Sequence, residues 1–228
     1  MWLFNSSVGK KVIMSVSGIA LVLFLLFHMS MNLVAIFSAK GYNMICEFLG
    51  ANWYALIATA GLAALVVVHF VYAIILTLQN RKARGGQGYA YTVKPKNVEW
   101  ASQNMFVLGV IVILGMALHL FNFWANMQLV EVLHMLGANV DASLAADGVH
   151  YIKETFACPV YVALYVIWLV ALWFHLTHGF WSALQTLGWA NQIWFNRWRV
   201  IGNVIVTIII LGFLAVVAVY AVCPCAGC

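Results

Sequence analysis

The chain has 228 residues, of which 65% are hydrophobic and 7% are charged, and its formal net charge is +5. A soluble domain averages about 45–50% apolar and about 25% charged residues, so this chain could not cover a soluble globule with polar groups. The composition also excludes a disordered chain, and 5 cysteines are too few for a disulfide scaffold. An integral membrane protein remains, with no soluble basic surface on which to bind nucleic acid.

Five stretches lack Asp, Glu, Lys and Arg: residues 12–39, 48–80, 100–130, 155–196 and 200–228. Each exceeds the roughly 20 apolar residues that cross a bilayer as a helix. The first is too long for the apolar core of a secretion signal, and no small-residue cleavage pattern follows it. We predict an all-α membrane protein with one domain, 1–228, and five transmembrane helices near residues 12–36, 55–79, 103–125, 159–185 and 201–222.

The charges between these spans predict the orientation. With a cytoplasmic N-terminus, the outer side receives only Lys40 and Lys153 together with five of the six acids. The inner side receives nine basic residues: Lys10, Lys11, Arg81, Lys82, Arg84, Lys94, Lys96, Arg197 and Arg199. This positive-inside asymmetry predicts a cytoplasmic N-terminus and an outer C-terminus. In the connections we expect a short surface helix around Met127–Met135. The tryptophan-rich stretch Gly188–Trp198 is expected to lie along the cytoplasmic interface rather than to extend a span.

Histidine is the most informative residue type in the spans. His134 and His150 fall in the outer loop, where we interpret them as solvated, but five histidines lie within spans, where ionisable groups are rare and usually functional. These are His28, His69, His119, His175 and His178. At about 1.5 Å of rise per residue, the first and third predicted helices place His28 and His119 roughly 25–30 Å from the cytoplasmic edge. His69 and His175 lie roughly 15–18 Å from it. Depth therefore predicts an outer pair, His28 with His119, and an inner pair, His69 with His175.

Two histidine pairs at two levels favour two haems stacked inside the bundle. Cofactor sites in bundles use side chains from facing helices, and a six-coordinate haem needs only two axial ligands. No Asp, Glu or Cys lies beside these histidines to complete a zinc shell. Small residues near the ligands would make room for the ring, although they also mark close helix packing: Ser17, Gly18, Gly61, Gly109, Gly115 and Gly179. His175 and His178 share one side of the fourth helix, and depth does not separate them.

Several motifs resemble one known family along nearly the whole chain. The most specific is the N-terminal block with Ser6-Ser7-Val8-Gly9-Lys10-Lys11, Met14, Ser17-Gly18, Phe24, His28 and Asn32-Leu33. Weaker matches are His69 with Asn80-Arg81-Lys82-Ala83-Arg84, Trp100-Ala101-Ser102 before His119, and His175-Leu-Thr-His-Gly179 with Gln185-Thr186-Leu187-Gly188. These residues resemble the single-subunit, five-helix, dihaem cytochrome b membrane anchor of succinate dehydrogenase and quinol:fumarate reductase.

The resemblance implies that His28 and His119 ligate an outer haem b and His69 and His175 an inner haem b. The family's fourth-helix ligand precedes a glycine by four positions, which selects His175 through Gly179 and leaves His178 as a neighbour or propionate partner. Gln103 stands where relatives often have Arg, so no propionate role is expected there.

The resemblance also implies the protein's partners and place. A flavoprotein subunit and an iron–sulfur subunit would dock on the basic inner face, in the bacterial inner membrane, and the whole complex is often a dimer in this family. The chain would then be the quinone-reactive subunit of the enzyme, a respiratory electron-transport protein with menaquinone as substrate and a slight lean to fumarate reduction. It carries no dicarboxylate active site, because it has no flavin-binding glycine motif and no hydrophilic domain.

Quinol oxidation releases protons, and no acid lies in a span core. Glu47, in the first outer loop, is the acid best placed to approach the outer haem, and we weigh a role as quinol proton acceptor evenly against a solvated loop acid.

Other interpretations stay open. Cys46 and Cys158 are expected to be small apolar residues, and the Cys223-Pro-Cys225-Ala-Gly-Cys228 tail has no assigned role. One alternative is the dihaem cytochrome b of another membrane dehydrogenase or hydrogenase. Its catalytic partner would dock on the outer side, whereas the basic inner face favours docking inside. A histidine-relay transporter is the alternative of a different class, but the spans contain no carboxylate, no Pro-broken helix pair and no inverted repeat.

Overall fold

The protein is all-helical in the computed structural model, which describes residues 6–84, 100–189 and 191–222. Five of its helices are long and apolar enough to cross a membrane. They are α2 (Ser7–Phe37), α4 (Trp53–Arg84), α6 (Met105–His119) continued by the π-helix η1 (Leu120–Trp124), α9 (Pro159–Thr186) and α10 (Trp194–Val222). The predicted all-α class and the five candidate spans are therefore confirmed, and the protein is a multi-pass membrane protein by length and composition.

Short helices connect the long ones. They are α3 (Ala39–Phe48), α5 (Trp100–Gln103), α7 (Gln128–Met135) and α8 (Gly148–Phe156). The surface helix predicted around Met127–Met135 is confirmed as α7, whereas α3 and α8 had no sequence prediction.

Local capping explains where these helices begin and end. The Ser6 hydroxyl accepts a hydrogen bond from the Gly9 backbone N–H (2.9 Å) and starts α2. Ser38 ends α2 and starts α3, because its extended backbone breaks the helix while its hydroxyl accepts from the Gly41 N–H (3.0 Å). Pro159, in the first turn of α9, occupies a position where its missing N–H costs no hydrogen bond.

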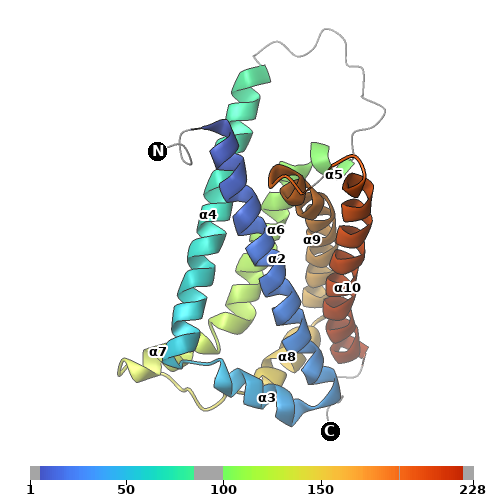
Figure 1. Cartoon of the computed structure of the whole chain (residues 1–228). Coiled ribbons are helices and arrows are strands. Elements are labelled where there is room, and N and C mark those ends of the chain that lie inside the picture. Colours follow the sequence, from blue (N-terminus) through green and yellow to red (C-terminus); the bar gives the residue numbers. More distant parts are fainter. Residues whose placement is uncertain (1–5, 85–99, 190, 223–228) are drawn as a thin grey trace.

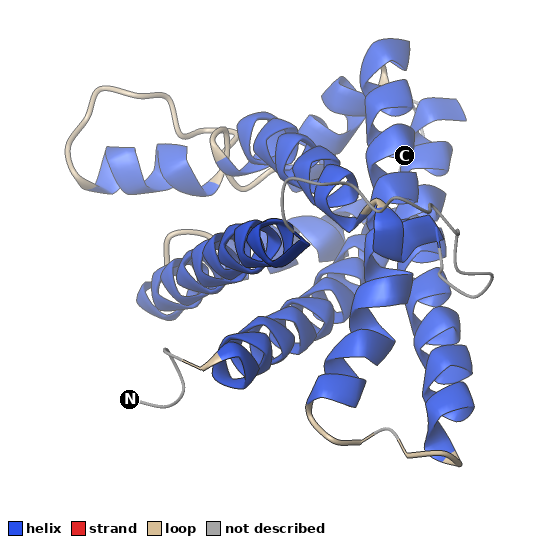
Figure 2. Ribbon diagram, turned by 90° about the horizontal axis from the view of Figure 1, so that it is seen from above, coloured by secondary structure: helices blue, strands red, loops and turns tan. Residues whose placement is uncertain are grey.

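The long helices form a bundle in which α2 and α9 are central (Figure 1). Helix α2 packs against α4, α9 and α10, and α9 packs against α6 and α10. Helix α2 begins at one end of the bundle and α10 ends at the other, as an odd number of crossings requires. Figure 2, seen from above, shows the helices side by side around the bundle interior. Four of the long helices therefore bring the histidine-bearing segments toward one another.

Charge is distributed unequally between the two ends of the bundle. The end that carries α3, α7 and α8 in Figure 1 holds Lys40 and Lys153 and all the acids of the described residues. The opposite end holds the remaining described basic residues, which are Lys10, Lys11, Arg81, Lys82, Arg84, Arg197 and Arg199. Lys94, Lys96 and Glu99 lie outside the described residues.

The expectation for Gly188–Trp198 is wrong from Trp194 onward, because that part extends the last span as the start of α10. The Asn191 side-chain oxygen accepts hydrogen bonds from the backbone N–H groups of Ile193 (3.0 Å) and Trp194 (2.8 Å), which favours helix initiation at this point. No Pro or Gly interrupts the residues that follow until Gly202.

The best-buried core lies between α2, α9 and α10. Val206, Ile209 and Tyr220 of α10 are completely buried, and the Tyr220 hydroxyl donates a hydrogen bond to the Ala35 carbonyl of α2 (2.8 Å). Many large apolar side chains elsewhere on the long helices are exposed, such as Leu114 at 64%. Such an outer surface suits lipid rather than water.

Candidate functional site

Four histidine rings meet in two pairs inside the bundle. His28 of α2 lies beside His119, the last residue of α6, with ring centroids 5.8 Å apart and ring planes at 84°. His69 of α4 lies beside His175 of α9, with ring centroids 6.4 Å apart and planes at 65°. The structure thus brings together the same pairs that depth in the sequence predicted. Haem ligation by these pairs stays a prediction.

The spacing of each pair suits one metal ion between two imidazoles. Metal–imidazole nitrogen bonds of about 2.0–2.1 Å put the two nitrogens about 4 Å apart and the ring centroids about 6 Å apart. Both observed separations fall near that value. Among the described residues, no group of three or more His, Cys, Asp or Glu side chains is placed to hold a metal ion. The described part of the chain therefore offers histidine pairs and no larger cluster of such side chains.

Aromatic rings surround the outer pair. On one side, Phe24 stacks on His28 at 5.3 Å and Phe213 of α10 lies 5.7 Å from it. On the other side, His119 contacts the rings of Phe123 (5.1 Å) and Trp168 (5.8 Å). This surface is apolar and polarisable, and it suits a flat apolar ring system.

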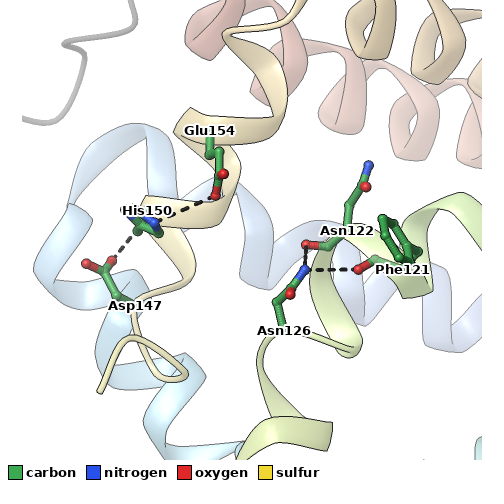
Figure 3. Close-up of polar contacts among 6 residues, drawn as sticks. All are labelled: Phe121, Asn122, Asn126, Asp147, His150 and Glu154. Carbon is green, nitrogen blue, oxygen red and sulfur yellow. Dashed lines mark hydrogen bonds and ion pairs between the residues drawn. The ribbon is translucent and has the colours of Figure 1, made fainter. Parts of the chain in front are cut away.

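A π-helical turn directly follows His119. In η1 the backbone N–H of Ala125 bonds to the Leu120 carbonyl, and this wider turn places Asn122 in the interior at 7% exposure. The Asn122 amide donates a hydrogen bond to the Tyr165 hydroxyl of α9 (3.3 Å). Asn126 donates to the Phe121 and Asn122 carbonyls, as Figure 3 shows. Isolated π-turns often mark functional sites, and this one fixes the helix end that carries a predicted ligand.

A polar chain leads to His28 from the end of the bundle that carries α3, α7 and α8. The Tyr42 hydroxyl of α3 donates to the Asn32 side-chain oxygen (3.1 Å). The Asn32 amide donates to the His28 carbonyl (2.8 Å) and lies 3.5 Å from His28 Nε2. Burial raises the pKa of Tyr42, which keeps its phenol protonated and able to donate. Sequence reasoning gave Asn32 no role, although its position four residues after His28 signals the same helix face.

The Nδ1 atoms of the two rings in the inner pair differ in their hydrogen bonding. His69 Nδ1 lies 3.1 Å from the Ser17 hydroxyl of α2, and Ser17 is 2% exposed. His175 Nδ1 is buried and has no hydrogen-bond partner among the described residues. A buried imidazole nitrogen without a hydrogen-bond partner is costly, and a metal bound at Nε2 of the same ring would leave this Nδ1 unpaired.

The small residues predicted to make room for a ring have different surroundings. A methyl group at Gly18 would lie 3.2 Å from His69 Cε1, and one at Gly109 would lie 3.8 Å from His175 Cε1. At Gly115 the methyl group would overlap the Trp168 indole, so that glycine accommodates a tryptophan. One at Gly179 would meet Met105, and one at Gly61 would meet nothing within 4 Å.

The remaining candidate residues are not members of the two pairs, although His178 interacts electrostatically with His175. His178 is one turn after His175 on α9 and contacts the Trp181 ring (5.1 Å). Glu47 is exposed on α3. A different acid, Glu131 of α7, accepts a hydrogen bond from the Ala51 backbone N–H (2.6 Å) in the connection between α3 and α4.

The two histidines predicted to lie in a loop are found in short helices instead. His134 is in α7, and His150 is in α8 with its ring 3.7 Å from the Glu154 carboxylate and its backbone bonded to Asp147 (Figure 3). The His150 side chain is 43% exposed, so its surroundings are those of a surface residue. Cys46 and Cys158 are free thiols, and the Cys223, Cys225 and Cys228 tail lies outside the described residues.

In comparisons with known proteins, no family model, no curated protein and no solved structure matches the chain.

Proposed function

We propose that the chain is a dihaem cytochrome b, the membrane-anchor and electron-transfer subunit of a succinate:quinone or quinol:fumarate oxidoreductase. His28 and His119 would hold an outer haem b, and His69 and His175 an inner one. One observation carries the proposal: four span histidines meet in two pairs, and each pair is formed across two helices. The ring separation in each pair suits two imidazoles that bind one metal ion. When bound by these histidines, haem b would supply one-electron redox chemistry.

The chain's own residues would hold and shield the two groups. The aromatic side chains around the outer pair exclude water, and they orient both imidazoles by packing on them. The π-turn after His119 and the Asn122–Tyr165 hydrogen bond fix the position of that ligand. Ser17 and Gly18 allow α2 to approach His69 closely.

The partners and the substrate in this proposal come from the family resemblance. A flavoprotein and an iron–sulfur subunit would dock on the end of the bundle with Lys10, Lys11, Arg197 and Arg199, taken as the cytoplasmic side by the positive-inside rule. Menaquinone would react near the outer pair, and Glu47, exposed on α3, remains the proposed proton acceptor. The slight lean to fumarate reduction belongs to the same proposal.

A reduced-minus-oxidised absorption spectrum of the purified protein, with a pyridine haemochrome count, tests the proposal. We expect two haems b per chain with low-spin bis-imidazole bands. One haem per chain would refute the two-level assignment. A protein without haem would refute electron transfer and favour the histidine-relay transporter instead.

A further inference from the structure

The inner histidine pair contains an inter-helix hydrogen bond whose proton can be located. Ser17 Oγ lies 2.8 Å from the Ile13 carbonyl and 3.1 Å from the Met14 carbonyl, both in its own helix. The same oxygen lies 3.1 Å from His69 Nδ1 on α4. A hydroxyl has one proton to donate, so only one of these three contacts can use it.

The shortest of the three contacts favours donation to the Ile13 carbonyl, the common i−4 bond of a serine inside a helix. Ser17 Oγ then faces His69 with a lone pair, and the ring must supply the proton from Nδ1; the Met14 backbone carbonyl of α2 is a second acceptor for this ring. A neutral imidazole protonated on Nδ1 keeps the lone pair on Nε2, which is the nitrogen that can bind a metal.

The surroundings hold this arrangement in place. Ser17 is 2% exposed, so water does not compete for its lone pairs. Gly18, the next residue, allows the ring to lie close to α2, because a methyl group there would be 3.2 Å from His69 Cε1. His175 Nδ1 has no such partner in the described part of the chain, so the two rings of the inner pair differ.

We propose that Ser17 is a positioning residue for the inner site: it holds His69 as the Nδ1–H tautomer, with Nε2 free to bind iron, and makes this imidazole the more basic of the pair. The inference rests on the proposed function. A metal-bound histidine whose other ring N–H donates a hydrogen bond is a stronger electron donor to the metal, so it stabilises the oxidised iron. Loss of the Ser17 oxygen should therefore raise the midpoint potential of one haem.

The test compares Ser17→Ala with Ser15→Ala in the full-length purified protein. Both changes remove one oxygen from a buried serine of α2, with Ser15 at 6% exposure, and the Ser17 hydroxyl is the one that lies beside His69. Redox titration and low-temperature EPR are recorded on each. We expect both variants to keep two haems, S17A to raise one midpoint potential and shift one low-spin EPR signal, and S15A to match wild type. Ser17→Thr, which keeps the hydroxyl, should return both readouts toward wild type.

The outcomes separate this inference from the proposed function. If wild type holds two haems and S17A leaves both potentials and EPR signals unchanged, the role of Ser17 is refuted while the haem assignment stands. The same holds if S17T shifts them as far as S17A does. If wild type holds no haem, the proposed function fails and the role of Ser17 toward iron fails with it.

Discussion

Replacement of Gly115 by alanine should damage the outer site through a tryptophan. A methyl group on Gly115 would overlap the indole of Trp168, which packs on His119 at 5.8 Å. The indole is also held by a hydrogen bond from its Nε1 to the Val112 carbonyl (3.0 Å). The overlap involves Cγ, Cδ1 and Nε1 of the rigid five-membered ring of the indole. The indole or α6 must therefore move to relieve it.

The magnitude follows from three contributions to the free energy of unfolding. Overpacking costs about 1–3 kcal/mol, and loss of the Trp168 hydrogen bond costs about 1 kcal/mol. The better helix propensity of alanine offsets about 1 kcal/mol. Gly115→Ala should therefore destabilise the protein by about 1–3 kcal/mol and lower the content of one haem.

Unfolding in mixed detergent–SDS micelles, together with a haem count, measures both effects. Leu114→Ala is the matched control, since Leu114 is the adjacent residue and is 64% exposed on the outer surface of the bundle. A side chain that faces lipid gains little from burial, so this control should stay close to wild type. If G115A were as stable as L114A and kept an unchanged spectrum, the close packing of α6 on α9 at Trp168 would be refuted.

Three further predictions concern other parts of the chain. His28→Ala or His119→Ala should remove one haem and largely spare the other, as measured by the haemochrome count and redox titration. Tyr220→Phe should lower the free energy of unfolding by about 0.5–1.5 kcal/mol, because it removes the bond to the Ala35 carbonyl (2.8 Å), while the haem spectrum stays unchanged. Burial raises the pKa of the Cys46 thiol to about 11, so at pH 8 its thiolate fraction should be about 100-fold below that of an ordinary cysteine. Its alkylation by iodoacetamide, followed by peptide mapping, should be correspondingly slow and should accelerate as the pH approaches 11.

Each of these has a contradicting result. Loss of a different haem in H28A and in H119A would refute the outer pair. A Y220F protein as stable as wild type would show that the buried hydroxyl adds nothing to the contact between α10 and α2. Rapid alkylation of Cys46 at pH 8 in the folded protein would contradict the packing of this α3 thiol against Gly148 of α8.

Hydrophobicity and charge in the sequence predicted the five long helices because crossing a membrane constrains every residue of a span at once. The short helices depend instead on single capping residues and on contacts with distant parts of the chain. Helix α3 depends on one capping residue, Ser38, and α8 on Asp147, whose side chain accepts from the His150 N–H and from the Asn43 amide (2.7 Å). Asn43 is 104 residues away, so this contact has no local signal in the sequence.

The sequence by itself determined the class of protein, its five candidate spans and the depth of each histidine, since helical rise converts residue number directly into height. Height alone cannot say which way a side chain faces or what lies beside it. Only the tertiary structure decided that Gly115 accommodates Trp168 rather than a bound ring, and that Ser17 meets His69 while His175 Nδ1 has no hydrogen-bond partner among the described residues. These contacts depend on how helices far apart in the chain rotate and pack against one another, and that is fixed by the fit of many side chains together.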